Sequence, residues 1–128
     1  MNTLSYVNVF ARDIVALSDF YSRLFGFTEI EGIRSPIFRG LDTGKSCIGF
    51  NALQAYELLG LGEYAGSSGV RFLLNIDVPG QAEVDRLVPL ALASGATLVK
   101  APYLTYYNWY QAVLLDPEQN VFRINFML

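Results

Sequence analysis

Apolar and polar residues alternate at both ends of the chain, and this alternation predicts β-strands because successive strand side chains point to opposite faces. The two stretches cover residues 4–11 and 121–128. Over residues 13–25 the apolar positions instead recur every three or four residues, which predicts an amphipathic helix. Asp13 is placed to cap the start of this helix and Gly26 to end it.

The same order of elements occurs twice. After the first helix, the pattern predicts three strands at 27–31, 36–41 and 46–52. The second half predicts a strand, a helix and three strands, at residues 72–78, 81–94, 96–100, 110–115 and 121–128. Pro89 lies inside the second helix and predicts a kink there.

The two halves can be overlaid residue by residue. L-D-T-G-K-S-C-I-G-F-N at 41–51 aligns without a gap with L-D-P-E-Q-N-V-F-R-I-N at 115–125. We therefore predict one α+β domain with two tandem βαβββ modules, at about 4–52 and 71–128. The connector, 53–70, is expected to contain a short helix at 53–59.

Strand parity predicts which side chains lie against the helices. The expected helix-facing set is Val7, Val9, Phe50, Phe72, Leu74 and Ile76, and the predicted stripe of the second helix is Val84, Leu87, Val88, Ala91 and Leu92. The alternate residues point away from the helices, and they mix polar with apolar types, which is typical of a ligand-binding face. They are Tyr6, Asn8, Phe10, Cys47, Gly49, Asn51, Leu73, Asn75, Asp77, Val121, Arg123 and Asn125.

Composition excludes several classes of function. Hydrophobic residues make up 52% of the 128 residues, and the net charge of −3 is scattered without a basic run, so nucleic acid is a poor candidate partner. There is no signal-peptide pattern and no apolar stretch long enough to cross a membrane, so we expect a cytoplasmic protein without membrane partners. The single cysteine, Cys47, excludes an internal disulfide and is expected to be a small buried residue. The chain has no histidine, which removes the commonest general base and metal ligand.

Two motifs resemble the vicinal-oxygen-chelate superfamily, which includes glyoxalase I, extradiol dioxygenases, and fosfomycin- and bleomycin-resistance proteins. Y-V-N-V-F-A-R-D-I-V-A-L-S-D-F-Y-S-R-L-F-G-F at 6–27 is similar to the family's opening strand and helix. L-L-D-P-E-Q-N-V-F-R-I-N-F at 114–126 is similar to its closing strand, with Gln119 in place of a glycine. The resemblance implies a curved, mostly antiparallel sheet around a concave cavity, helices on its outer face, and a homodimer.

In enzymes of this superfamily, His and Glu ligands hold a metal ion at up to four equivalent strand positions. Here those positions hold Tyr6, Gly49, Leu73 and Arg123. Glycine and leucine have no ligating side chain, and a guanidinium would repel a divalent ion. We therefore predict no metal, no other cofactor and no catalytic residue of the family's metal chemistry. Asp42 and Asp116 are predicted to be turn residues, so the carboxylates form no convincing catalytic pair.

Arg123 is the central candidate for ligand binding, because a guanidinium can donate to an anionic or carbonyl oxygen. The alternative is a salt bridge with Asp77. The aromatic run 103–111 is the second candidate, since the resemblance implies that it rims the cavity. Trp109 and one of Tyr106 or Tyr107 are expected to contact the ligand, although packing on a dimer partner or on the second helix is the alternative. The full expected ligand set is Tyr6, Asn8, Phe38, Asn51, Tyr107, Trp109, Gln111 and Arg123.

For the asparagines, the alternative to ligand binding is a mutual hydrogen bond between Asn8 and Asn75. The leading hypothesis is metal-independent binding of a small aromatic or apolar molecule, neutral or acidic, with sequestration of the bleomycin-resistance type as the nearest analogue. The first alternative is an enzyme of the lyase, isomerase or oxygenase kind that uses residues the sequence does not identify. The second is a sensory or structural domain whose cavity its own aromatic residues fill.

Overall fold

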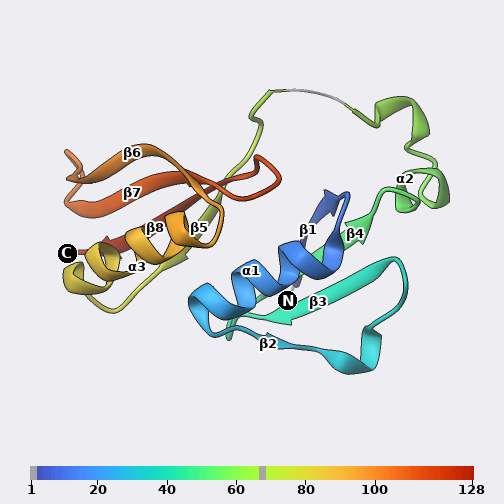
Figure 1. Cartoon of the computed structure of the whole chain (residues 1–128), viewed down its shortest axis with the longest axis horizontal. Helices are drawn as coiled ribbons and strands as arrows, with labels where there is room; N and C mark the ends of the chain where they lie inside the picture. The colour runs from blue at the N-terminus through green and yellow to red at the C-terminus, as the bar shows by residue number, and fades with distance from the viewer. Residues whose placement is uncertain (1–2, 67–68) are drawn as a thin grey trace. The chain divides into compact units, whose positions relative to one another are not determined.

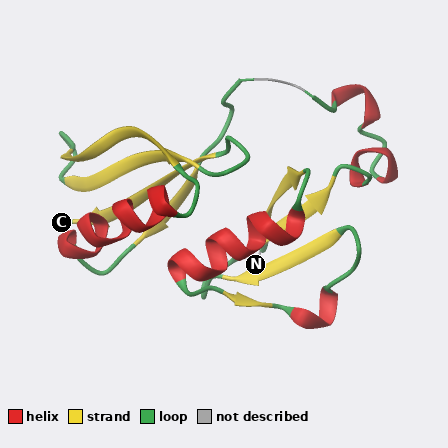
Figure 2. Cartoon of the chain, viewed as in Figure 1, coloured by secondary structure: helices red, strands yellow, loops and turns green. Residues whose placement is uncertain are grey.

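The chain has an α+β fold of two tandem βαβββ modules, described by a computed structural model over residues 3–66 and 69–128. It divides into two compact units, Met1–Ser68 and Gly69–Leu128. In each unit one long helix lies along a four-stranded sheet (Figures 1 and 2). The predicted repetition of one supersecondary unit is therefore confirmed.

The first module is built around a sheet with strand order β1-β4-β3-β2. β1 and β4 run parallel, whereas the other two pairs are antiparallel. A parallel pair needs a long crossover, and here it contains the helix together with the other two strands of the sheet. The elements are β1 (Tyr6–Ala11), α1 (Ile14–Phe25), β2 (Thr28–Glu29), the 3-10 helix η1 (Glu31–Ile33), β3 (Phe38–Asp42) and β4 (Cys47–Ala52).

The second module repeats this topology with strand order β5-β8-β7-β6. β5 and β8 are parallel, and β7 pairs antiparallel with both β8 and β6. Its elements are β5 (Leu74–Asp77), α3 (Gln81–Ala93), β6 (Thr97–Leu104), β7 (Trp109–Leu115) and β8 (Val121–Met127).

The predicted connector contains the expected short helix, α2 (Ala55–Leu58), followed by the 3-10 helix η2 (Gly62–Tyr64). Tyr56 of α2 stacks on Phe10 of β1, with ring centroids 3.9 Å apart. This contact ties the start of the connector to the first sheet. Residues 67 and 68 of the predicted connector lie outside the described residues.

The predicted helix boundaries follow from capping chemistry. The Asp13 side chain accepts a hydrogen bond from the Ala16 amide at 2.9 Å, which satisfies a donor that the helix itself leaves unpaired. Gly26 ends α1 in the left-handed region, with φ 74°, and its amide donates to the Ser22 carbonyl. The capping predictions at both ends of α1 are therefore confirmed.

Each core lies between the helix and one face of the sheet. In the first module, Val9, Tyr21 and Phe50 are among the buried residues. In the second, the buried residues include Leu74, Ile76, Val84, Leu87, Val88, Ala91, Leu114, Phe122 and Ile124. Strand parity thus identified the helix-facing side of both sheets.

Three expectations about burial were wrong. Phe72 precedes β5 and is 54% exposed, because the strand that would hold it against α3 begins only at Leu74. Leu92 lies at the edge of the apolar stripe of α3 and is 40% exposed. Cys47 is half-buried, since it starts β4 on the side of the sheet that α1 does not cover.

Several strand boundaries also differ from the prediction, and the largest difference is at the end of β6. Glu31 belongs to η1, so β2 ends at Glu29. β6 runs on to Leu104, with irregular pairing to β7 on either side of Lys100. These irregularities interrupt the simple alternation on which the prediction depended.

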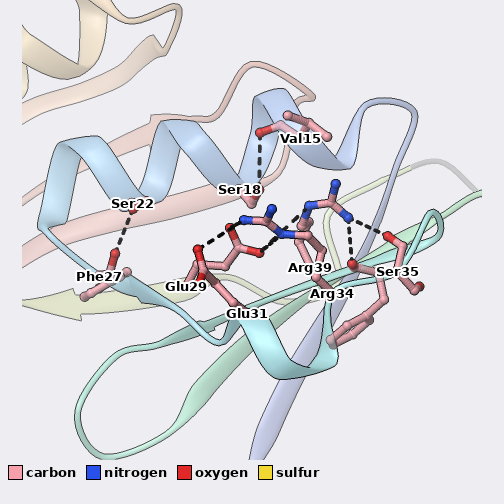
Figure 3. Close-up of polar contacts among 10 residues, drawn as sticks. Val15, Ser18, Ser22, Phe27, Glu29, Glu31, Arg34, Ser35 and Arg39 are labelled. Carbon is pink, nitrogen blue, oxygen red and sulfur yellow. Dashed lines mark hydrogen bonds and ion pairs between the residues drawn. The ribbon is translucent and has the colours of Figure 1, made fainter.

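An ion-pair cluster stabilises the edge of the first module (Figure 3). Arg34 donates two hydrogen bonds of 2.7 Å to the Glu29 carboxylate, and Arg39 lies 4.0 Å from the same carboxylate. Arg39 also donates to the Ser35 and Phe38 carbonyl oxygens. The hydrogen bonds from Arg34 hold the pKa of Glu29 below its ordinary value. The cluster therefore links β2, β3 and the intervening loop.

Over the described residues, no helix combines the length and the apolar character required to cross a bilayer.

Candidate functional site

Each sheet has a second face, turned away from its helix, which we call the open face of that module. Register places its residues in rows across the strands, because paired residues of neighbouring strands share a face. In the first module the rows are Tyr6–Cys47–Asp42, Asn8–Gly49–Gly40 and Phe10–Asn51–Phe38. In the second they are Asp77–Asn125–Gln111–Tyr103, Asn75–Arg123–Val113–Lys100 and Met127–Trp109.

The registers confirm the internal overlay made from the sequence. Asn8 pairs with Gly49 in the first module as Asn75 pairs with Arg123 in the second. Gly40 pairs with Gly49 as Val113 pairs with Arg123. Gly49 and Arg123 are therefore structurally equivalent, although their chemistry differs completely.

Glycines form the middle of the open face of the first module, and nearby side chains cover them. A Cβ atom added to Gly49 would overlap the Asn8 side-chain oxygen and would lie 2.8 Å from the Phe38 ring. One added to Gly40 would lie 2.9 Å from Ile33 and 3.3 Å from Phe38. The Asn8 amide and the Phe38 ring thus occupy the space that a larger side chain would need.

Tyr6 lies at one end of this face, beside Cys47 in register. Desolvation raises the pKa of its phenol, and the neighbouring Cys47 and Asp42 raise it further. Each of these effects disfavours the phenolate. As an ordinary tyrosine would, Tyr6 presents a neutral hydroxyl group, which can donate a hydrogen bond, at physiological pH.

Arg123 is held in place by asparagine on the open face of the second module. Its Nε donates to the Asn75 Oδ1 at 2.7 Å, and the Asn75 Nδ2 donates to the Asp77 Oδ1 at 2.9 Å. Within the described part of this module, no carboxylate forms an ion pair with Arg123. Asn75 thus separates Arg123 from Asp77, so the direct salt bridge expected as the alternative is not formed. Both of these hydrogen bonds of the Asn75 side chain are to residues of the second module.

The aromatic run forms a short series of edge contacts that ends at Arg123. The guanidinium carbon lies 5.6 Å from the centroid of the Trp109 ring. Trp109 contacts Tyr107 edge-on, with centroids 5.3 Å apart, and Tyr107 contacts Tyr106 at 4.9 Å. Tyr106 is 97% exposed. Of the two candidates, Tyr107 is therefore the one that contacts Trp109.

Tyr110 has the opposite parity and belongs to the other face of the sheet. Its hydroxyl donates to the Asp85 carboxylate of α3 at 2.6 Å. This hydrogen bond raises the pKa of Tyr110, and burial raises it further. The expectation that part of the aromatic run packs on the second helix is confirmed for this residue.

Gln111 is buried, with only 2% of its surface exposed. It belongs to the row Asp77–Asn125–Gln111–Tyr103, which we call the polar row. Its Nε2 donates to the Tyr103 hydroxyl at 2.9 Å, while Tyr107 donates weakly to its Oε1 at 3.5 Å. Gln111 therefore positions the two tyrosines that lie on either side of it.

Besides Asp77, the polar row contains two residues that the predicted ligand set lacks, Asn125 and Tyr103. Asn125 is fully buried and donates to the Asp77 Oδ1 at 3.0 Å. Among the described residues, its Oδ1 is the one buried side-chain oxygen or nitrogen without a hydrogen-bond partner. Tyr103 lies in β6, and the ammonium group of Lys100 sits 3.9 Å from the centroid of its ring.

The eight residues predicted to bind ligand divide equally between the modules. Tyr6, Asn8 and Asn51 project from β1 and β4, and Phe38 projects from β3. Trp109, Gln111 and Arg123 project from β7 and β8, with Tyr107 in the loop before them. Each group of four belongs to its own module. The predicted ligand set lacks Lys100 and Tyr103, because the irregular pairing of β6 hid their parity.

The residues at the family's metal positions do not fit a metal ion. The described residues contain no group of three or more His, Cys, Asp or Glu side chains that could hold one. The neighbour of Gly49 is the amide of Asn8, Leu73 precedes β5, and Arg123 carries a positive charge. No step of metal chemistry can be derived from this donor set.

Comparison with solved structures identifies a close relative. The chain is 70% identical to a glyoxalase/bleomycin resistance protein/dioxygenase family enzyme from Burkholderia phytofirmans PsJN. The match covers 97% of this chain and 98% of that chain, with a TM-score of 0.95. A scan against protein-family models gave no match, and neither did a search of curated proteins.

More distant structures share the fold alone. A lactoylglutathione lyase from Agrobacterium tumefaciens is 16% identical, with 98% of this chain and 94% of that chain covered and a TM-score of 0.75. TioX from Micromonospora sp. ML1 is 20% identical, with 99% and 100% covered and a TM-score of 0.69.

Proposed function

The chain belongs to the glyoxalase/bleomycin resistance protein/dioxygenase family, and we propose that it binds a small aromatic or apolar organic molecule without a metal ion. The observation that carries the proposal is the arrangement around Arg123. Asn75 fixes its Nε, the guanidinium lies near the Trp109 ring, and no carboxylate of the described second module neutralises it. A guanidinium next to an aromatic surface can bind a ligand that combines a flat apolar body with a polar oxygen.

The open face of the first module supports binding by different means. Phe38 supplies apolar contact area over Gly40 and Gly49. Tyr6 supplies a neutral hydroxyl donor, because a tyrosine phenol is protonated at physiological pH and the raised pKa of Tyr6 acts in the same direction. We propose that Tyr6, Asn8, Phe38 and Asn51 contribute contacts to the same kind of ligand.

We also propose that the ligand leaves the protein unchanged, as sequestration requires. The chain has no histidine, and the rows described for each open face contain one carboxylate, Asp42 in the first module and Asp77 in the second, so neither set of rows offers a carboxylate pair for general acid and base work. The alternative is catalysis, because the Burkholderia relative is described as an enzyme. Mass spectrometry of the ligand recovered after incubation separates the two, since an enzyme returns a product of different mass or connectivity.

The proposal is tested with probes that share one aromatic body. Naphthalene-2-carboxylate, naphthalene-2-carboxamide and naphthalen-2-ylmethylamine are each screened by thermal shift, with and without EDTA. We expect at least one probe to raise the midpoint temperature of thermal unfolding, since a ligand that binds only the folded state stabilises it by mass action. EDTA is expected to leave the shift unchanged. The proposal fails if no probe stabilises the protein, or if stabilisation disappears with EDTA and returns with added metal.

A further inference from the structure

We propose that the ligand is an aromatic carboxylic acid whose anion lies over Gln111, between Arg123 and Lys100. This inference rests on the proposed binding function and names the chemical class of the ligand. Its basis is a second cation, Lys100, which sequence patterns did not place and which the structure brings to the same face as Arg123.

Sheet register fixes the relation between the two cations. Arg123 pairs with Val113, and Val113 pairs with Lys100, so the three residues occupy one row of the open face. Neighbouring strands lie about 4.8 Å apart, which places the two cationic residues roughly 10 Å apart at their backbones. Val113 forms an apolar floor between them. Two long side chains at this separation can both reach one small anion.

Each cationic group lies near an aromatic ring whose residue is a register partner or strand neighbour of Gln111. The Lys100 ammonium lies 3.9 Å from the centroid of the Tyr103 ring, and Tyr103 is the register partner of Gln111. The Arg123 guanidinium is 5.6 Å from the Trp109 ring, and Trp109 stands two residues before Gln111 on the same strand. Arg123 on β8 and Lys100 on β6 therefore belong to the two strands that flank β7, the strand of Gln111.

The one carboxylate of these rows, that of Asp77, is held by two asparagine amides through one of its oxygens. The Asp77 Oδ1 accepts hydrogen bonds from both Asn75 and Asn125, at 2.9 and 3.0 Å. Neither Lys100 nor Arg123 forms an ion pair with a carboxylate of the described second module. The two rows thus carry two cations against one carboxylate, in a protein whose net charge is −3. A local positive charge on an acidic protein favours an anionic ligand over a cationic one.

The hydrogen-bonding groups also suit a carboxylate. The Tyr103 oxygen accepts from Gln111, so its hydroxyl hydrogen remains available for a ligand oxygen. Arg123 uses its Nε for Asn75, which leaves the terminal amino groups of the guanidinium to donate. Trp109 and Tyr107 provide the adjoining aromatic surface. A flat acid would pair its anion with the donors and its ring with these side chains.

The test compares naphthalene-2-carboxylate with naphthalene-2-carboxamide by isothermal titration calorimetry at pH 7.5. The two probes share their ring system and differ in charge. We expect the wild-type protein to bind the acid at least about tenfold more tightly, the size of one charge-assisted hydrogen bond. Arg123→Gln should weaken the acid by about tenfold, and Lys100→Gln by about threefold because Lys100 is exposed to solvent. Both variants should weaken binding of the amide less than binding of the acid, because the carbonyl oxygen of the amide carries no charge.

Arg86→Gln is the matched control. It removes one positive charge from the same module, but from α3, where Arg86 pairs with Glu83 on the helix. This variant should bind the acid as the wild type does. Lys100 lies on the edge strand β6, so Lys100→Gln is expected to fold even if Arg123→Gln does not. Circular dichroism checks the fold of each variant.

Equal affinity for acid and amide in the wild type would overturn the inference and leave the proposed binding function standing. So would equal losses of acid affinity in Lys100→Gln and Arg86→Gln, because the effect would then be one of overall charge. Failure of both probes to bind the wild type would overturn the inference and count against the proposed function as well.

Discussion

The two modules share a topology and a register but differ at the centre of their open faces. In the first module the centre is glycine, covered by the Asn8 amide and the Phe38 ring. In the second the equivalent position is Arg123, held by Asn75 near Trp109. The helix-facing sides show no such difference, since both are closely packed apolar cores. The duplicated scaffold thus keeps its core chemistry in both copies and varies the face that can meet a ligand.

The largest expected effect is a loss of unfolding free energy on truncation of a core residue, and its size should be the same in both modules. Phe50 and Phe122 are both fully buried against their helices. Phe50→Ala and Phe122→Ala should each cost about 3–5 kcal/mol of unfolding free energy, because each leaves a cavity in a packed core. Urea denaturation followed by circular dichroism measures the loss. A loss below about 1 kcal/mol in one variant alone would show that the two cores are not comparable.

The equivalent open-face positions should respond differently to mutation. Gly49→Ala should cost about 1–2 kcal/mol of stability, because its new Cβ displaces the Asn8 amide and the Phe38 ring. Arg123→Ala should cost less, since it removes a half-buried side chain and leaves no clash. The same denaturation experiment measures both.

The Gly49 prediction has an internal control. Adding Asn8→Ala to Gly49→Ala removes the nearest obstacle, so the double variant should recover part of the loss. Strictly additive effects of the two substitutions would contradict the account of Gly49.

The paired asparagines provide a test of binding. Asn75→Ala frees the Arg123 Nε and should weaken naphthalene-2-carboxylate by about threefold to tenfold, because the guanidinium loses its fixed position. Asn8→Ala, at the equivalent place in the first module, should have the smaller effect. Calorimetry of the two variants decides the order. A larger loss of affinity in Asn8→Ala would show that the main polar contact with the ligand lies in the first module.

The smallest expected effect concerns pH. Each module has a Glu–Arg pair, Glu29 with Arg34 and Glu83 with Arg86, and in both the hydrogen bonds from arginine lower the pKa of the carboxyl group. A lowered folded-state pKa means that the contribution to stability is present above the ordinary value of 4.5 and is lost as pH falls through the folded-state value. Glu29 is the less exposed of the two and also has Arg39 nearby.

Glu29→Gln should therefore reduce the loss of stability between pH 6 and pH 3 more than Glu83→Gln does. The contribution of Glu29 is expected to be below about 1 kcal/mol. Thermal midpoints measured from pH 6 down to pH 3 test this order. Identical profiles for wild type and Glu29→Gln would exclude a stabilising role for the cluster.

Regular alternation explains why so much of the fold could be predicted from the sequence. The parity of β1, β4, β5 and β8 placed Asn8, Gly49, Asn75 and Arg123 on the correct face. Local capping chemistry placed the ends of α1, because Asp13 and Gly26 act through their immediate neighbours. These features depend on short-range geometry, which the sequence expresses directly.

The errors arise where the geometry is not locally regular. Irregular pairing around Lys100 lengthens β6 and brings Lys100 and Tyr103 to the open face, which no simple period predicts. Arg123 could equally have paired with Asp77, and only the side-chain arrangement shows Asn75 between them. Hydrogen-bond partners of long polar side chains depend on tertiary contacts, so the sequence left this choice open.

Calorimetric titration of naphthalene-2-carboxylate into EDTA-treated, metal-free protein tests metal-independent binding most directly. Elemental analysis of the same sample confirms that it contains no metal. We expect saturable binding with the affinity of untreated protein, because Arg123, Lys100 and the aromatic side chains supply the contacts. Absence of binding until a divalent metal is restored would contradict the account.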